Sequence, residues 1–276
     1  MVVTDAWTDA VRQQLALGRI LPLGGPGDGA WITERAASGV LRRAASRLHG
    51  VRTGRIRLSL ADPGAAGEPA VPPPASALPP GLLRVEAEFA AGTRQPLPET
   101  AERLRELLLA SAEDDLGLEA TVVDLRVTDV LDGEPGTEEP PGPDRGEQDE
   151  GCADGQDGDD RGRDAAGARP RKEPDGTSRE GGRTEPGTVR HVADAVVAVP
   201  GVTRLAPALG GLARAVRLQD EEEPQRRHVE VQLATALSHR TLDVARAVRS
   251  AVTAAAAADT AIPVTVAVLV TAVDQP

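Results

Sequence analysis

Aromatic side chains are almost absent from this chain of 276 residues. Trp7, Trp31 and Phe89 are the only Phe, Trp or Tyr residues, and the formal net charge is −12. Proteins that bind nucleic acid need a basic surface and often stack bases on aromatic rings. Carbohydrate sites and aromatic cages need rings as well. We therefore expect no nucleic-acid partner, no carbohydrate site and no aromatic cage.

Cysteine and clustered histidine are also lacking. Cys152 is the sole cysteine, which excludes an internal disulfide and any cysteine-based zinc cluster. No histidine has metal-ligand spacing to another histidine or to the cysteine. We interpret all four as solvated polar residues: His49, His191, His228 and His239.

Targeting and membrane-spanning signals are not found. The N-terminus has no basic region followed by an apolar run, as a secretory signal would. The best apolar stretch, Ile262 to Val273, is well short of the ~20 residues that span a bilayer as a helix. We expect a cytoplasmic protein without direct membrane insertion, whose membrane association, if any, comes through a partner or an amphipathic surface.

Residues 132–187 differ sharply in composition from the rest of the chain. They contain no Ile, Leu, Val, Met, Phe, Trp or Tyr, and they hold 17 acidic against 8 basic residues. Ordering such a segment would cost on the order of 50–100 kcal/mol in conformational entropy, with no large apolar side chains to offset it. The composition predicts a disordered acidic linker between two folded units, residues 30–131 and 188–276.

The first unit shows helix and strand periodicities in the order α-β-β-α-β. Spacings of three and four residues indicate two amphipathic helices, of which the second opens at Pro98 and ends at Gly117. Alternation indicates strands with one wet face, with Glu86 and Glu88 pointing outward. The predicted inward side chains are Ile32, Ala36, Val40, Ala44, Leu48, Ile56, Leu58, Leu60, Val85, Ala87, Phe89, Ala101, Leu104, Leu108, Ala112, Val123, Leu125 and Val127.

The second unit repeats this order. Its first helix is followed by Gly201, and its second opens at Thr241, a suitable N-cap residue. Its predicted strands lie at residues 213–218, 229–233 and 264–270. The fold class is therefore α+β, with two small units, each a three-stranded sheet with two helices on one face. The inward stripes are Val189, Val192, Val196 and Val199, then Val229, Val231 and Leu233, then Ala245, Val248, Val252 and Ala256, then Val264, Val266, Val268 and Val270.

Two segments lie outside this internal repeat. Within residues 1–29, positions 5–17 are expected to form a short helix that leads into a Gly-rich connector. Residues 61–81 hold seven prolines and are inserted between the first two strands of the first unit. We expect this loop to be disordered or polyproline-like. A tolerated surface insertion is favoured over a PxxP-type ligand.

No motif indicates catalysis. Gly24–Gly29 precedes a helix as phosphate loops do, but Gly-Lys-Ser/Thr is missing, so we interpret it as a flexible connector. Ser238 and His239 are adjacent, but no third group is nominated to orient them. Cys152 has acidic neighbours, whereas a reactive thiol needs positive charge. We expect no catalytic, cofactor-binding or metal residues. Two acidic clusters are interpreted as solvated charge, with weak cation binding as the alternative: Glu113–Asp115 and Asp220–Glu223.

The second unit resembles a known family. Ala198–Val202 follows a helix, Val229–Val231 forms a strand, Thr241–Val252 forms a helix, and alternating valines continue to Val273. This order is similar to the alkaline-shock, or general stress, protein family of Gram-positive bacteria, also called the envelope stress response family. The first unit resembles it less closely. Tandem copies across an acidic linker, together with the arginine-rich composition, resemble an actinobacterial variant.

The resemblance implies a non-enzymatic cytoplasmic protein that self-associates and is held near the membrane by a small membrane-anchored protein. The thin Val/Ala core of the second unit also favours association. The expected function is a structural or interaction role in envelope stress response, through self-association or partner binding. The alternative is a small-ligand-binding or enzymatic module with a site between the units. A polar cleft between the units would favour that alternative, and an apolar or charge-complementary patch on a sheet edge or helix face would favour the first.

Overall fold

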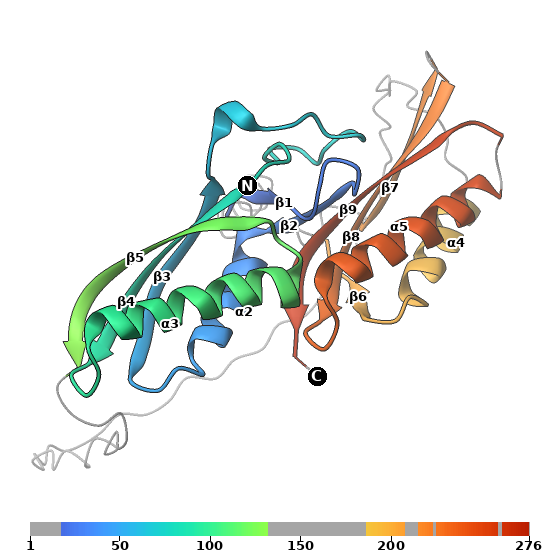
Figure 1. The fold of residues 1–276 in the computed structure, drawn as a ribbon. Coiled ribbons are helices and arrows are strands. Elements are labelled where there is room, and N and C mark those ends of the chain that lie inside the picture. Colours follow the sequence, from blue (N-terminus) through green and yellow to red (C-terminus); the bar gives the residue numbers. More distant parts are fainter. Residues whose placement is uncertain (1–17, 132–185, 208–214, 223–224, 259–260, 276) are drawn as a thin grey trace, which may run out of the picture. The chain divides into compact units, whose positions relative to one another are not determined.

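The chain has a mixed α/β fold, with four α-helices and two sheets among the residues that the structure describes (Figure 1). The structure is a computed structural model. The predictions for the helix at 5–17, for Cys152 and for residues 132–185 of the linker lie outside the described residues. Within the described part, no helix is long and apolar enough to cross a membrane. The described residues are 18–131, 186–207, 215–222, 225–258 and 261–275.

The smaller sheet has three strands in the order β3-β4-β5. β3 (Val51–Leu60) pairs antiparallel with β4 (Leu83–Gly92), and β4 pairs parallel with β5 (Ala120–Leu131). α2 (Glu34–Ala45) and α3 (Leu97–Ala110) pack against one face of this sheet. Along the chain these elements follow in the order α2, β3, β4, α3 and β5.

The predicted register of β4 is confirmed. Val85, Ala87 and Phe89 are fully buried against the helices, whereas Glu86 and Glu88 lie on the opposite face. Period two therefore separates a core face from an outer face, as alternation requires.

α2 begins later than predicted, at Glu34. The Thr33 hydroxyl accepts the Ala36 N–H at 3.3 Å and caps the helix. Trp31 and Ile32 instead belong to β2 (Ala30–Thr33). The placement of Ile32 on the helix was wrong because pairing with a distant strand outweighs a local helical spacing.

The larger sheet has six strands in the order β1-β2-β9-β8-β6, with β7 also paired to β8. α4 (Pro186–Val197) and α5 (Thr241–Ala257) pack on it through their predicted stripes. Three strands were predicted here, but the sheet has six, because β1 and β2 of the N-terminal segment join it and the C-terminal segment adds the short β6. The strands are β1 (Ile20–Pro22), β2, β6 (Val202–Leu205), β7 (Val216–Glu222), β8 (Gln225–Ala236) and β9 (Val264–Asp274).

Parallel pairing of β2 with β9 joins the N-terminal and C-terminal segments. Ala30 lies opposite Val268 and Ile32 opposite Val270. The Thr33 hydroxyl also donates to the Thr271 carbonyl at 3.2 Å. One continuous apolar cluster runs through both sheets and their helices.

The proline-rich insertion is folded, contrary to expectation. It contains a 3₁₀ turn at Pro63–Ala65 and is pinned to the N-terminal segment by two backbone bonds. The Ala70 N–H donates to Pro26 O at 3.0 Å, and the Leu78 N–H donates to Ile20 O at 2.8 Å. The insertion thereby covers the second face of β9. A separate apolar cluster forms there from Trp31, Val71, Ala267 and Leu269.

A π-helical turn, Ser111–Leu116, continues α3. It ends at Gly117, which has the left-handed φ of +84° expected of a helix-terminating glycine. The prediction that Thr241 caps α5 was wrong, because Arg240 is the cap residue and Thr241 is the first helical residue. The Thr241 hydroxyl instead donates to Asp115 O at 3.4 Å, which ties α5 to the π-helical turn.

Candidate functional site

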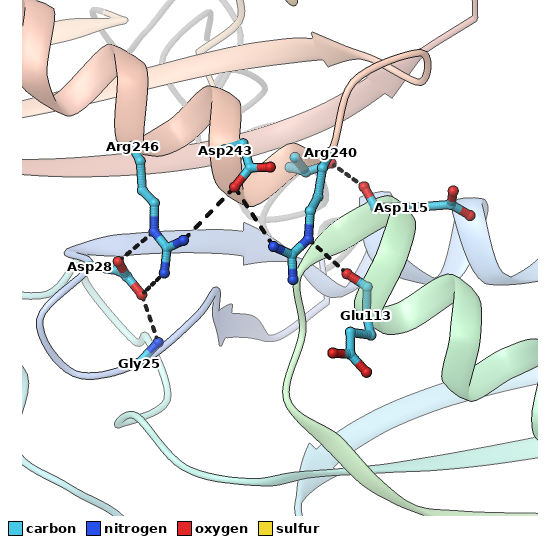
Figure 2. A network of polar contacts seen from close by, with 8 residues as sticks. Gly25, Asp28, Glu113, Asp115, Arg240, Asp243 and Arg246 are labelled. Atoms are coloured by element: carbon cyan, nitrogen blue, oxygen red, sulfur yellow. Dashed lines mark hydrogen bonds and ion pairs between the residues drawn. The ribbon is translucent and has the colours of Figure 1, made fainter.

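The Gly-rich segment Gly24–Gly29 is a folded turn between β1 and β2, not the expected flexible connector. The Asp28 carboxylate accepts the Gly25 N–H at 2.8 Å. It also accepts Nε and Nη2 of Arg246 at 2.8 and 3.1 Å (Figure 2). The Asp28 carboxylate thus accepts hydrogen bonds from the loop backbone and from a side chain of α5. These bonds hold the turn of the N-terminal segment against α5.

Arg240 and Arg246 extend this fastening along α5 (Figure 2). Asp243 lies 3.8 Å from Arg246 and 3.7 Å from Arg240. Arg240 Nε donates to the Glu113 carbonyl at 2.9 Å. Glu113, one of the predicted acidic cluster, therefore contributes its backbone to the network. We call this network the clasp. Its members are Gly25, Asp28, Glu113, Arg240, Asp243 and Arg246.

The hydrogen bond from Arg246 holds the pKa of Asp28 below its ordinary value. A depressed folded-state pKa stabilises the fold above the unfolded pKa, near 4, and this stabilisation is lost as the pH falls through the folded pKa. We expect Asp28→Asn to lower the free energy of unfolding by about 0.5–1 kcal/mol at pH 7, with a difference from wild type that shrinks as the pH falls below about 4.

Urea unfolding between pH 7 and pH 3 measures this difference. Asp114→Asn is the matched control, because Asp114 is exposed in the adjoining π-helical turn and is not one of the residues of the clasp. A penalty for Asp28→Asn that is unchanged at pH 3 would contradict the ionic origin of the contact.

Three of the four histidines are exposed, as expected: His49, His191 and His239. His228 is buried, which corrects the prediction of a solvated side chain. It lies on β8 between β7 and β9, and its Nδ1 is 3.0 Å from the Thr265 hydroxyl. In the described ranges, no group of three or more His, Cys, Asp or Glu side chains is placed to hold a metal ion.

The remaining sequence candidates are separate from one another. The Ser238 hydroxyl lies 3.1 Å from His239 Nδ1 in an exposed turn. Asp220 is not solvated charge, because it pairs with Arg227 across β7 and β8 at 2.7 and 2.9 Å, and this hydrogen bonding lowers its pKa. Glu223 lies outside the described residues.

The outer face of the three-stranded sheet carries a charge pattern that sequence reasoning did not single out. Arginines line β3, glutamates line β4, and both signs occur on β5. Arg84 pairs with Asp124 at 3.0 Å, and Arg52 pairs with Asp129 at 3.6 Å across the sheet. A shallow hollow of about 400 Å³ lies over this face, lined by Arg55, Arg57, Glu86, Ala87, Glu88, Asp124, Leu125 and Arg126.

β5 forms a long edge strand beside this face. Among the described strands it pairs with β4 alone. Its register with Phe89 and Ala91 places Val127 and Val130 on the helix side of the sheet, yet these side chains are 43% and 44% exposed. An edge strand that exposes apolar side chains is a template for pairing with another chain. We take the β5 edge and the adjoining outer face as the candidate interaction site.

The alternation of charged and apolar residues over 120–131 was the available signal for this site. The sequence indicated that Val127 points inward, but not that it lies where the helices leave it exposed. That exposure depends on the packing of α3 and on the strand order, neither of which periodicity encodes.

Comparison with protein families, with curated proteins and with solved structures found no match to this chain.

Proposed function

We propose that this protein acts by protein–protein contact, through self-association or partner binding, and not by catalysis. The observation that carries the proposal is the β5 edge, where Val127 and Val130 are exposed beside a face of mixed charge. A partner that adds a strand there would satisfy backbone groups and cover both valines.

The contact between the N-terminal and C-terminal segments supports this proposal over the ligand-binding alternative. That alternative places a site between the two, and would be favoured by a polar cleft there. Among the described residues, the contact consists of a continuous apolar core, the β2–β9 ladder and the clasp around Asp28. These groups contact each other, which fits a structural junction.

The finer architecture belongs to the proposal as well. In both segments an antiparallel strand, a parallel partner and two helices recur in the order β3-β4-β5 and β7-β8-β9. We interpret this as two divergent α-β-β-α-β copies that share one core. The link to the alkaline-shock family, to envelope stress and to a membrane-anchored partner rests on the sequence resemblance alone.

Photo-crosslinking in cells tests the proposed function. A photo-reactive amino acid in place of Val130 is expected to give discrete protein adducts, because a partner strand would lie within reach. Val197 on α4 is the matched control, since it is an exposed valine, 54% accessible, on a different element. We expect no discrete adduct at position 197.

Adducts of equal intensity at both positions would indicate collision and count against the proposal. The absence of any protein adduct at position 130, together with a monomeric chain in light scattering, would overturn it and favour the ligand-binding alternative.

A further inference from the structure

The β5 edge differs from every other sheet edge in the described part of the chain. β1 and β6 are short, with three and four residues. β7 ends in Asp220, Glu221 and Glu222, and β3 carries three arginines, Arg52, Arg55 and Arg57. These are the usual means by which edges avoid pairing. β5 has twelve residues and the exposed valines.

Charge decides which edges could meet their own copy. β3 presents Arg52, Arg55 and Arg57, so two antiparallel β3 strands would oppose like charges. Two β7 strands paired at their acidic ends would also oppose like charges. β5 instead carries Arg126 and Asp129, which have opposite signs and lie three positions apart.

Arg126 and Asp129 lie on the same face of the sheet. Arg126 is in register with Glu88, an outer-face residue, and Asp129 is in register with Ala90. Arg52 of β3 is in register with Ala90 as well. Its ion pair with Asp129 confirms that Asp129 lies on the outer face. The register shift of β5 between Phe89 and Ala90 brings this about, because it sets Thr128 apart from the alternation.

Consider a second copy whose β5 lies antiparallel to the first, with Val127 of each copy opposite Thr128 of the other. This register pairs the opposite charges at two places. Arg126 of each copy then lies opposite Asp129 of the other, on the outer face. Leu125 of each copy lies opposite Val130 of the other, on the helix side. Directly opposed residues in antiparallel strands share a face, and opposite charges in such positions are favourable.

This register also leaves existing contacts undisturbed. Arg105 Nε already donates to the Val123 carbonyl at 3.3 Å, and Asp124 already accepts from Arg84 at 3.0 Å. A register centred on Leu125 would also oppose Arg126 to an aspartate, Asp124, but would compete with both contacts. Among the described contacts, the register centred between Val127 and Thr128 competes with two, and both are exposed. They are the ion pair of Asp129 with Arg52 and the hydrogen bond that Asp129 accepts from the Val130 N–H.

We propose that the β5 edge pairs with β5 of a second copy of this chain, antiparallel, with Arg126 opposite Asp129. This inference rests on the proposed function and names the partner and the register for it. Each two-fold contact joins two three-stranded sheets into one of six strands, with the exposed valines covered at the junction.

Charge exchange tests this pairing in the full-length chain. Arg126→Asp and Asp129→Arg, made singly, each place like charges opposite one another twice, so each is expected to weaken dimerisation about tenfold or more in sedimentation velocity. The double variant restores opposite charges in reversed order and is expected to dimerise within about threefold of wild type. Arg35→Asp on α2 is the control for Arg126→Asp, because Arg35 is exposed and its replacement changes the net charge by the same amount.

The outcomes separate this inference from the proposed function. A wild-type chain that dimerises, but whose dimer is unaffected by the single exchanges or is not rescued by the double exchange, overturns the β5 pairing while self-association stands. A chain that stays monomeric to near-millimolar concentration also overturns it, and adducts to a different protein at position 130 would then leave the proposed function intact. Thermal unfolding of each variant tests whether the fold persists, and Asp129→Arg serves if Arg126→Asp does not fold.

Discussion

Phe89→Ala is expected to lower the free energy of unfolding by about 3–5 kcal/mol, because it removes a ring from a closely packed core. Phe89 lies on β4, the central strand of the three-stranded sheet, and is fully buried on the helix side. It is one of two large aromatic side chains in the described core. Such a loss is a large part of the stability of an ordinary domain.

Glu88→Ala provides the matched control on the same strand. Glu88 points to the outer face, so its truncation is expected to change the free energy of unfolding by no more than about 0.5 kcal/mol. Chemical denaturation of both variants gives the comparison. Similar losses in the two would mean that the strand register is wrong.

Gly117→Ala is expected to lower the free energy of unfolding by about 2–4 kcal/mol. Two effects add: the left-handed backbone, with φ of +84°, is strained for alanine, and the new Cβ would meet the Leu242 Cβ on α5. The second effect is not relieved by a simple rotation, because that atom is attached directly to the backbone of α5. The variant therefore strains the junction between the π-helical turn and α5.

Gly39→Ala is the opposite case and serves as its control. Gly39 lies within α2, and an added Cβ would meet no atom within 4 Å. Alanine is the better helix former, so this variant is expected to gain up to about 1 kcal/mol. Thermal and urea unfolding of both variants distinguish the two cases. A Gly117→Ala protein as stable as wild type would show that α5 does not press on this turn.

The junction of the two segments was the main feature that sequence reasoning did not reach. Ile32 has the spacing of four to Ala36 that marks a helix stripe, and it was placed on the helix for that reason. In the structure it pairs with Val270, far along the chain. Likewise, nothing near Val71 indicates that it packs on Trp31, and nothing near Asp28 indicates Arg246 as its partner.

The sequence likewise predicted only part of the candidate interaction site. The alternation of residues 120–131 showed which side chains of β5 share a face. It did not show that β5 is an edge, or that α3 leaves Val127 and Val130 exposed. Charge positions were readable, whereas their pairing, such as Arg52 with Asp129, required the strand order.

The sequence by itself determined the inward faces of most helices and strands and the turns at Gly117 and Gly201. These follow from local rules, since one apolar face must be buried and a left-handed turn suits glycine. The tertiary structure decided that six strands form the larger sheet, that the proline-rich loop covers β9, and that β5 pairs with β4 alone among the described strands. The physical reason is range: periodicity states which face of an element needs burial, but the partner that buries it is chosen by contacts between residues far apart in the chain.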